Sequence, residues 1–370
     1  MHRRLTPVLT RTALALFAIC LSAVAQAQAR PDAGAMQQQI DRERMQALPP
    51  KGGLERPAEP PAMRPSGGVA VTVTAFRFAG NTLLRSEQLS PAVEGYLNRP
   101  LDFSELQKAA AAVATAYREA GWIVRAYLPR QDITGGTVTI QIVEAVFGGL
   151  RLEGPKPSRE SSYHVMDMIE AQQKVGEPLN ADALDRALLL ASDLPGVTVS
   201  GSLGEGKRSG ETDLVVKFAD KPLIIGDAAL DNTGSRSTGP ARFAGNLSIN
   251  SPFGAGELVT TNFIHTQKND QLASDGSDYV RMGLTHPIGL DGFRVGVNAS
   301  YLKYNLIAPE YAALDAYGTS ATVGLEATYP LIRSRMQNIY LNANIDHKSF
   351  NNKSLDTVTS HYMSDSCLSG

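Results

Sequence analysis

One short segment contains the residue types of a phosphate-binding loop. Gly201-Ser-Leu-Gly-Glu-Gly206-Lys207-Arg208 places glycines and a lysine at nearly the spacing that surrounds nucleotide phosphates. That chemistry also needs a serine or threonine after the lysine, to bind Mg²⁺, and a helix directly after the loop. Arg208 stands where the serine should be, and the residues that follow predict a strand. We therefore predict a hairpin turn here rather than a nucleotide site.

The other candidate catalytic and metal-ligating residues are scattered along the chain. The six histidines stand at positions 2, 164, 265, 286, 347 and 361, without an HExxH pair, and no Gly-x-Ser-x-Gly segment occurs. Asp231 and Asn232 have the chemistry of calcium ligands, but a turn at a strand end is the simpler interpretation. Cys20 lies in a segment that we expect to be removed, which leaves Cys367 without a partner for a disulfide or a zinc cluster. The sequence therefore predicts a protein that is not an enzyme and has no metal site or cofactor.

The N-terminus predicts a secretory signal. Three arginines precede an apolar run from 13 to 25, and small residues at alternate positions follow it. The run is shorter than the roughly 20 apolar residues that a transmembrane helix needs. We therefore assign residues 1–29 to a cleaved signal peptide. The net charge of −2 gives no general attraction to nucleic acid.

Two polar segments follow the signal. Residues 30–48 favour a helix, but Met36, Ile40 and Ala47 form only a thin apolar stripe, so this helix suits a polar, wet environment. Residues 49–68 contain six prolines and predict an extended, semi-rigid linker.

An internal duplication covers residues 69–145 and 146–221. Each half predicts the order strand, helix, helix, strand, strand over roughly 75 residues, which indicates one small unit repeated in tandem. Asp102 or Ser104 is expected to cap the longer helix of the first half, and Asn180 that of the second. Strands are predicted at 71–78, 122–128, 136–144, 147–152, 197–203 and 213–218.

In residues 222–350, helices give way to strands with alternating apolar and polar residues. These strands are predicted at 224–231, 242–250, 258–266, 279–286, 293–301, 319–329 and 339–346. In one of them, Val323 and Leu325 share a face opposite Thr322 and Glu326. The predicted fold class is therefore α+β followed by all-β.

Three features favour a transmembrane β-barrel over a soluble sandwich. The strands approach about 9–11 residues, the length of a tilted transmembrane strand, whereas soluble strands average about 5–6. Short turns, such as 289–292, alternate with long polar loops, such as 268–277. Aromatic residues, including Tyr279, Phe293 and Tyr329, stand at strand ends, as at a membrane interface. The seven predicted strands make this barrel incomplete, since bacterial barrels have at least eight.

These features resemble a known family of transporters. The repeated units look like POTRA domains, which have the order β-α-α-β-β. The segment Asp231-Asn232-Thr-Gly234, followed by Thr238-Gly239, is similar to the motif that opens the barrel in two-partner secretion transporters of the hemolysin-activator and filamentous-haemagglutinin type. The resemblance extends over residues 32–350.

The resemblance implies an outer-membrane transporter with two periplasmic POTRA domains. Its partners would be an unfolded secreted exoprotein and the outer-membrane lipid, and it would act as a monomer. The implied parts are a plug-like helix in the barrel lumen (30–48), a linker (49–68), POTRA 1 (69–145), POTRA 2 (146–221) and the N-terminal part of the barrel (222–350).

An exposed sheet edge of POTRA 1 is the expected binding site for the exoprotein. An extended segment can add to such an edge through backbone hydrogen bonds. We expect this at strand 122–128, beside the helix 104–120, with Trp122, Arg125 and Tyr127 as contacts. The alternative for Trp122 and Tyr127 is a place in the hydrophobic core.

The C-terminal end departs from the family pattern. The alternation weakens, no Val-Arg-Gly-Tyr-like loop motif occurs, and the last residue is not aromatic. We therefore interpret residues 351–370 as the aberrant tail of a C-terminally truncated product. Two alternatives stay open: a barrel-assembly factor of the same superfamily, or a periplasmic peptide-binding fragment whose incomplete barrel does not insert. Heat-modifiable migration of the membrane-extracted protein separates the fragment from both membrane proteins.

Overall fold

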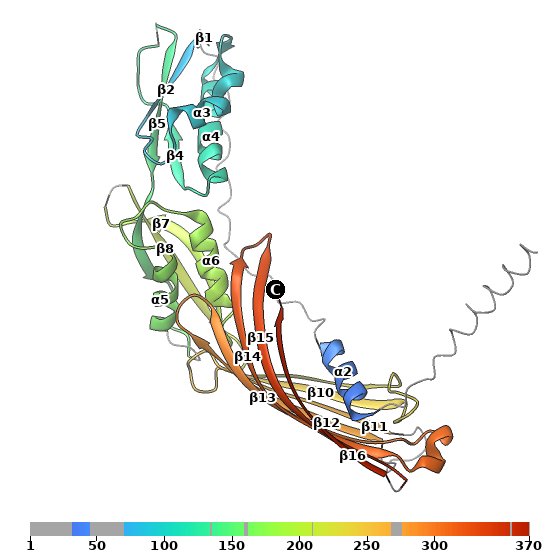
Figure 1. Ribbon diagram of the computed structural model, residues 1–370. Helices are drawn as coiled ribbons and strands as arrows, with labels where there is room; N and C mark the ends of the chain where they lie inside the picture. Colours follow the sequence, from blue (N-terminus) through green and yellow to red (C-terminus); the bar gives the residue numbers. More distant parts are fainter. Residues whose placement is uncertain are drawn as a thin grey trace, which may run out of the picture.

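The computed structural model describes residues 32–44, 70–133, 135–158, 162–208, 210–267, 276–355 and 357–369. Two small α/β units lie end to end, and a wide, curved sheet extends from the second one (Figure 1). The predicted signal peptide and the proline-rich linker lie outside the described residues. Within these segments, no helix is both long and apolar enough to cross a membrane.

The first unit has a three-stranded sheet covered by two helices. Its elements are β1 (Val71–Thr72), β2 (Ala75–Ala79), α3 (Ser86–Val93), the 3-10 helix η1 (Glu94–Tyr96), β3 (Pro100–Leu101), α4 (Phe103–Glu119), β4 (Val124–Tyr127) and β5 (Thr137–Glu144). The order in the sheet is β2-β5-β4, with β2 parallel and β4 antiparallel to the central β5. The predicted order of strand, helix, helix, strand, strand is confirmed.

Two predicted strands of this unit are shorter in the structure. The predicted strand 71–78 is interrupted at Val73, whose carbonyl accepts the Asn98 N–H (2.8 Å) outside the sheet. The predicted strand 122–128 begins only at Val124, because the residues before it bond to the second unit.

The helix α4 begins at a capping box. Asp102 accepts the Glu105 N–H (2.8 Å), and the Glu105 carboxylate accepts the Asp102 N–H (3.2 Å), which satisfies two backbone groups at the helix start. The predicted cap at Asp102 is therefore confirmed. From this start, the helix turns Val113 and Tyr117 into the core, where they lie in one cluster with Ile140 of β5.

A hydrogen-bond network fastens the loop before α3 to the end of β5. The Glu144 carboxylate accepts the N–H groups of Thr82 (2.7 Å) and Leu83 (2.8 Å), the Thr82 hydroxyl and the Tyr117 hydroxyl (2.8 Å). Burial raises the pKa of Glu144, but the hydrogen bonds from Leu83 and Thr82 outweigh it and hold the pKa below its ordinary value of 4.5. Burial, together with Glu144, raises the pKa of Tyr117 well above its usual range.

The second unit repeats the plan of the first. Its elements are β6 (Val146–Leu152), α5 (Ser162–Gln172), α6 (Ala181–Ser192), β7 (Val197–Glu205) and β8 (Glu211–Asp220). The sheet order β6-β8-β7 places β8 in the centre, as β5 is in the first unit. Asn180 accepts the Ala183 N–H (3.0 Å) and caps α6, as predicted. The segment from Gly201 to Arg208 ends β7 and turns back into β8, which confirms the predicted hairpin.

Backbone hydrogen bonds join the two units. The Ile123 N–H donates to the Leu179 carbonyl (3.1 Å), and the Leu179 N–H donates to the Ala145 carbonyl (2.8 Å). Trp122 forms a β-bridge with Asn180 beside them. Because main-chain bonds cross the junction on both sides of Leu179, the two units are held as one stack.

The remaining strands form an eight-stranded antiparallel sheet in sequence order. Its strands are β9 (Ile224–Asp231), β10 (Ala241–Asn250), β11 (Leu258–Gln267), β12 (Ser277–Ile288), β13 (Phe293–Asn305), β14 (Tyr317–Arg333), β15 (Asn338–Ser354) and β16 (Thr357–Ser369). The 3-10 helix η2 (Pro309–Leu314) lies in the connection from β13 to β14. All seven predicted strands are present.

The predicted aberrant tail, residues 351–370, continues this sheet instead. β15 extends beyond residue 350, and β16 pairs with it along its whole length. The strand is hard to see in the sequence because small polar residues stand on both of its faces. Ser364 and Ser366 share the face of Leu368, whereas Thr359 shares the opposite face with Asp365.

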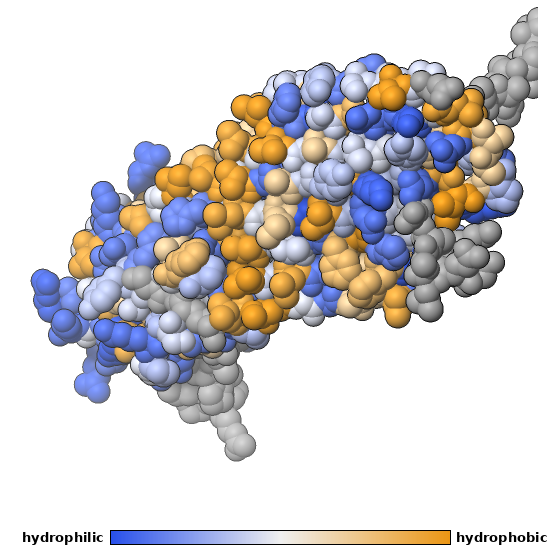
Figure 2. All heavy atoms as spheres, turned by 90° about the horizontal axis from the view of Figure 1, so that it is seen from below, coloured by the Kyte–Doolittle hydropathy of each residue, from blue (hydrophilic) through white to orange (hydrophobic). Residues whose placement is uncertain are grey.

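The sheet is apolar on its outer face and polar on its inner face. On β14, Val323 and Leu325 are 63% and 57% exposed, whereas Thr322 is 3% exposed. Figure 2 views the molecule from below and shows apolar side chains, in orange, spread over the outer face. A soluble sandwich covers its apolar face instead. The predicted alternation is confirmed, with the apolar residues pointing outward.

The helix α2 (Ala33–Arg44) lies against the inner face, over β13, β14 and β15. The Gln37 side chain donates to the Ser300 hydroxyl (3.5 Å), and the Ala33 N–H donates to the Asn352 side chain (3.3 Å). Ala33 also packs in a small apolar cluster that includes Phe350. The polar helix predicted before the proline-rich linker is therefore present, in polar surroundings.

Replacement of Glu144 by glutamine should weaken the first unit and flatten its response to acid. The folded-state pKa of Glu144 lies below its unfolded value, so its hydrogen bonds stabilise the fold above pH 4.5 and are lost as the pH falls through the folded-state pKa. We expect Glu144→Gln to lower the free energy of unfolding at neutral pH by about 1–2 kcal/mol. This difference should shrink in acid.

Urea unfolding of the full chain, followed by fluorescence, measures this effect. Trp122 is the only tryptophan and packs beside the core of the first unit, so it reports on that unit. Glu119→Gln, at an exposed position on α4, is the matched control. It should change neither the free energy of unfolding at neutral pH nor its dependence on pH. A difference for Glu144→Gln that stayed constant into acid would contradict the assigned role of the carboxylate charge.

Candidate functional site

The strand β4 is an exposed edge of the first unit and a candidate site for an extended polypeptide. It pairs with β5 on one side, and the described residues give it no neighbouring strand on the other. Such an edge keeps a row of unpaired backbone N–H and C=O groups, to which another chain can add. The helix α4 flanks β4, in the arrangement that the sequence predicts.

Arg125 and Tyr127 project from this edge strand on the same side. Both residues are exposed, and the guanidinium carbon of Arg125 lies 5.7 Å from the centre of the Tyr127 ring. That distance is typical of a cation–π contact, which holds the two side chains together. An aromatic face and a hydrogen-bond donor therefore stand next to the open backbone edge. Their role as binding contacts stays a prediction.

Trp122 has different surroundings from these two residues. It is half-buried, packs against the core of the first unit and bridges to Asn180 at the start of α6. The preceding residue, Gly121, has a φ of +83°, and a Cβ there would lie 2.9 Å from the Asp182 carboxylate. The backbone at this point is therefore fixed by the junction. Trp122 therefore packs at the margin of the core of the first unit, and its role as a binding contact stays a prediction.

Asp231 and Asn232 lie where β9 turns toward β10. The Asp231 carboxylate accepts the Thr233 N–H (2.9 Å) and pairs with the Arg242 guanidinium on β10 (3.2 Å). Both carboxylate oxygens are thereby engaged within the protein, as in a turn at a strand end. The described part of the chain contains no group of three or more His, Cys, Asp or Glu side chains that could hold a metal ion.

The glycines of the same motif allow a tight connection. The Gly234 N–H donates to the Pro240 carbonyl (2.9 Å), and a Cβ on Gly234 would lie 2.3 Å from the Gly239 carbonyl oxygen. Gly239 has a φ of +119°, which strains any other residue. The Thr238 carbonyl accepts the Thr266 hydroxyl of β11 (2.9 Å). The barrel-opening motif is therefore a structural element that ties three strand ends together.

The inner face carries a band of hydrogen-bonded polar side chains. The Asn262 amide donates to Asn246 (2.7 Å), and the Asn246 amide donates to Asp227 (3.0 Å), so the band crosses β9, β10 and β11. Arg281 stands next in register on β12, and its guanidinium lies 3.8 Å from the Glu326 carboxylate. The inner face thus offers hydrogen-bond donors, hydrogen-bond acceptors and charges of both signs, so water can wet it.

Sequence reasoning places these residues on polar faces but does not single out the band. The band exists only because polar residues of neighbouring strands stand opposite one another, which depends on strand register. Register is set by turns such as 251–257, where the backbone folds around the buried Glu257. The length of such turns is the sequence signal from which the band could have been found.

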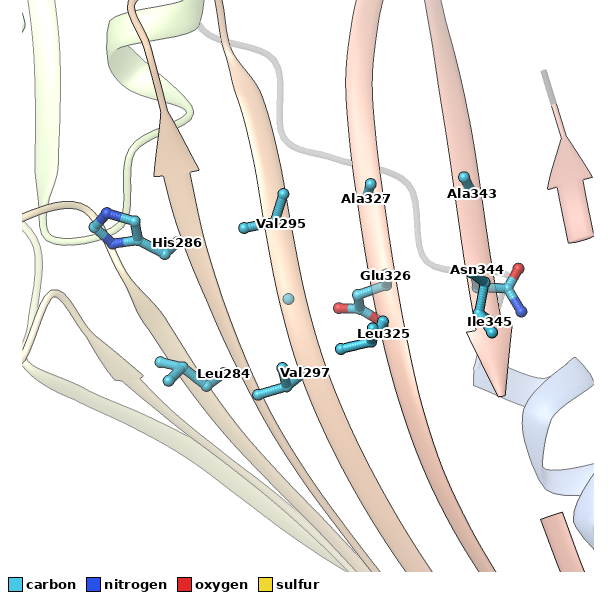
Figure 3. Close-up of a pocket in the computed structure, with 11 residues that line it drawn as sticks. Leu284, His286, Val295, Val297, Leu325, Glu326, Ala327, Ala343, Asn344 and Ile345 are labelled. Atoms are coloured by element: carbon cyan, nitrogen blue, oxygen red, sulfur yellow. The ribbon is translucent and has the colours of Figure 1, made fainter. Parts of the chain in front are cut away.

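The outer face has a shallow groove of about 420 Å³ across β12 to β15 (Figure 3). Leu325 and Ile345 stand on its border, and the small side chains of Ala327 and Ala343 leave the hollow between the strands. His286 lies at one end. The groove lies on the face away from α2 and the polar band, and most of the side chains that line it are apolar.

Two family models match the chain. The model described as "POTRA domain, ShlB-type" matches residues 71–145, which is the first unit. The model described as "Haemolysin secretion/activation protein ShlB/FhaC/HecB" matches residues 210–362, which includes the sheet from β9 into β16.

Relatives and a solved structure agree with these matches. The heme/hemopexin transporter protein HuxB of Haemophilus influenzae is 25% identical over 341 residues, which are 90% of this chain and 58% of HuxB. The outer membrane transporter CdiB of Escherichia coli is 27% identical over 188 residues, 50% of this chain and 31% of CdiB. The structure of CdiB from Escherichia coli superposes with a TM-score of 0.64 at 21% identity, over 92% of this chain and 64% of that one, which shows the shared fold.

The chain thus spans somewhat more than half the length of HuxB. The two units have the POTRA order of elements, so we call them POTRA 1 and POTRA 2. With a barrel-like sheet that is apolar outside, and with both family models in the matching order, the chain belongs to the two-partner secretion transporters, outer-membrane proteins whose POTRA domains lie in the periplasm.

Proposed function

We propose that this protein takes up an unfolded partner exoprotein in the periplasm and secretes it across the outer membrane. The observation that carries the proposal is the inverted polarity of the sheet, which is attached directly to two POTRA domains. An extensive exposed apolar face is stable against hydrocarbon, whereas a polar inner face needs water. The sheet therefore separates lipid from a wet path, as a polypeptide transporter requires.

Uptake begins, in this proposal, at the edge of β4. An extended segment of the exoprotein adds as a further strand, so that backbone groups supply most of the hydrogen bonds. Arg125 and Tyr127 contribute contacts that do not depend on a particular sequence. This mode of binding fits a cargo that arrives unfolded and varies along its length, and it needs no nucleotide hydrolysis.

The helix α2 occupies the wet path and acts as a plug. Its apolar contact with the sheet is small, centred on Ala33, and its hydrogen bond from Gln37 to Ser300 is long at 3.5 Å. Water and a passing polypeptide can replace such contacts at little cost. Secretion therefore requires α2 to leave the inner face, which its weak attachment permits.

Removal of the β4 contacts should lower secretion. We expect Arg125→Ala combined with Tyr127→Ala to reduce cargo binding by about 1–2 kcal/mol, roughly five- to thirtyfold, because an aromatic and an arginine anchor are lost together. The cargo is measured as the protein that reaches the culture supernatant only when the transporter is expressed.

Arg77→Ala provides the matched control for this variant. Arg77 is also exposed, but it stands on β2 at the opposite edge of the same three-stranded sheet. Secretion should be unchanged in Arg77→Ala. Equal losses of secretion in the two variants, or no loss in either, would contradict the proposed role of β4 in cargo uptake.

A charge on the outer face should impair membrane insertion. Leu325 lies midway along β14 and points away from α2, so in this proposal outer-membrane lipid covers it around a single, monomeric chain. We expect Leu325→Arg to destabilise the inserted protein by about 2–4 kcal/mol, the cost of arginine near the bilayer midplane.

Thr328→Arg, on the inner face of the same strand, should insert normally. Heat-modifiable migration of membrane-extracted protein measures both variants. If Leu325→Arg inserted as well as Thr328→Arg, the outer face would not be in contact with hydrocarbon.

A further inference from the structure

POTRA 2 rests directly on the rim of the sheet, where two short turns meet α6 (Figure 1). Leu290, in the turn between β12 and β13, packs against the hydrophobic core of POTRA 2. Gly292 of the same turn has a φ of +86°, and a Cβ there would lie 2.6 Å from a methyl group of Leu190. The end of β14 and the turn that follows it lie beside this turn and contribute the charged contacts.

The central charged contact is a two-bond ion pair between Arg333 and Asp193. The Arg333 guanidinium donates to both carboxylate oxygens of Asp193, at 2.7 Å each, and also donates to Asn338 (2.9 Å). The Arg333 side chain is 4% exposed and that of Asp193 is 34% exposed. A buried guanidinium without its partner is strongly unfavourable, so the pair requires that the two surfaces stay together.

Further contacts surround this pair. Arg335 pairs with Asp185 (3.0 Å), and Arg186 donates to the Pro330 carbonyl (2.9 Å). All of these contacts join α6 to the end of β14 or to the turn after it. They hold α6 and the end of β14 together through three residues of α6 and its C-terminal end: Asp185, Arg186 and Asp193.

The stability of α6 does not explain why an aspartate, Asp193, stands at the C-terminal end of this helix. A carboxylate at the C-terminal end of a helix faces the negative end of the helix dipole, where a cation is preferred. The chain supplies that cation elsewhere, since Lys221 donates to the Ser192 and Leu194 carbonyls (2.9 and 3.1 Å). The carboxylate of Asp193 is therefore accounted for by Arg333.

We infer that the Asp193–Arg333 pair is a positioning device that fixes POTRA 2 at one place on the rim of the sheet. Backbone bonds through Leu179 hold POTRA 1 to POTRA 2, so the same pair also sets where β4 stands relative to the inner face. The consequence for cargo delivery rests on the proposed function. The positioning itself does not.

The distance between POTRA 2 and the rim tests the inference directly. Spin labels are placed at Glu170→Cys, on the exposed side of α5, and at Met336→Cys, in the turn after β14, in a Cys367→Ser background. The full chain in outer-membrane vesicles should give one narrow distance distribution. Breaking a buried ion pair should shift the docked–undocked equilibrium by about tenfold or more, so the distribution should broaden.

Three variants separate positioning from folding. Asp193→Arg and Arg333→Asp should each broaden the distribution, and the double variant, which exchanges the charges, should narrow it again. Arg333→Asp alters no residue of POTRA 2, so its effect cannot come from misfolding of that domain. Glu153→Arg is the matched control, because it breaks an exposed ion pair with Lys217 within POTRA 2 and should leave the distribution narrow.

The outcomes decide the inference without relying on secretion. A narrow distribution in both single variants, or a double variant that stays as broad as the single ones, would overturn it. Secreted cargo in the supernatant is the second measurement and should fall and recover with the distance distribution. If the parent chain secreted no protein, the proposed function would fail, while the distances would still decide the role of the pair.

Discussion

A peptide group inside hydrocarbon has no hydrogen-bond partner except another peptide group. The antiparallel ladder from β9 to β16 meets this condition between neighbouring strands, and it leaves the side chains to divide between two environments. Because successive side chains alternate, apolar residues such as Leu325 point outward, and polar ones such as Thr322 line the inside. The polar helix α2 and the hydrogen-bonded band follow from this division, since only the inner face can hold polar groups.

The features that the sequence predicts are those that depend on neighbours along the chain. The period of two in β9 to β15 and the caps at Asp102 and Asn180 are local patterns, and the structure contains them. β16 was not predicted because its serines and threonines remove the contrast between its faces, so only its pairing with β15 defines it. Local pattern therefore predicts a strand where its two faces carry residues of different polarity, and misses it where small polar residues stand on both faces.

The candidate site also contains some features that the sequence predicts and others that only the folded structure defines. Arg125 and Tyr127 lie on one face of a short strand, and their positions two residues apart already indicate that they are neighbours. Trp122 precedes the same strand, but its place is decided by a β-bridge to Asn180, which belongs to the other domain. The pair Arg333–Asp193 joins residues 140 positions apart. No sequence pattern connects such residues, because the contact exists only after both domains have folded.

An exposed sheet edge is a liability for most proteins, because it invites pairing with the wrong chain. POTRA 1 keeps β4 short, at four residues, and places the charged Arg125 in its middle, which limits unwanted pairing. Yet a short edge can capture only a short segment, and a weak local contact is useful for transport only if it is held near the path that the segment must enter. In the proposed function, attachment of POTRA 2 to the rim and of POTRA 1 to POTRA 2 meets that need. If cargo binds at β4, as we propose, the edge can remain weak and unselective because the contacts between the domains and the rim fix its position.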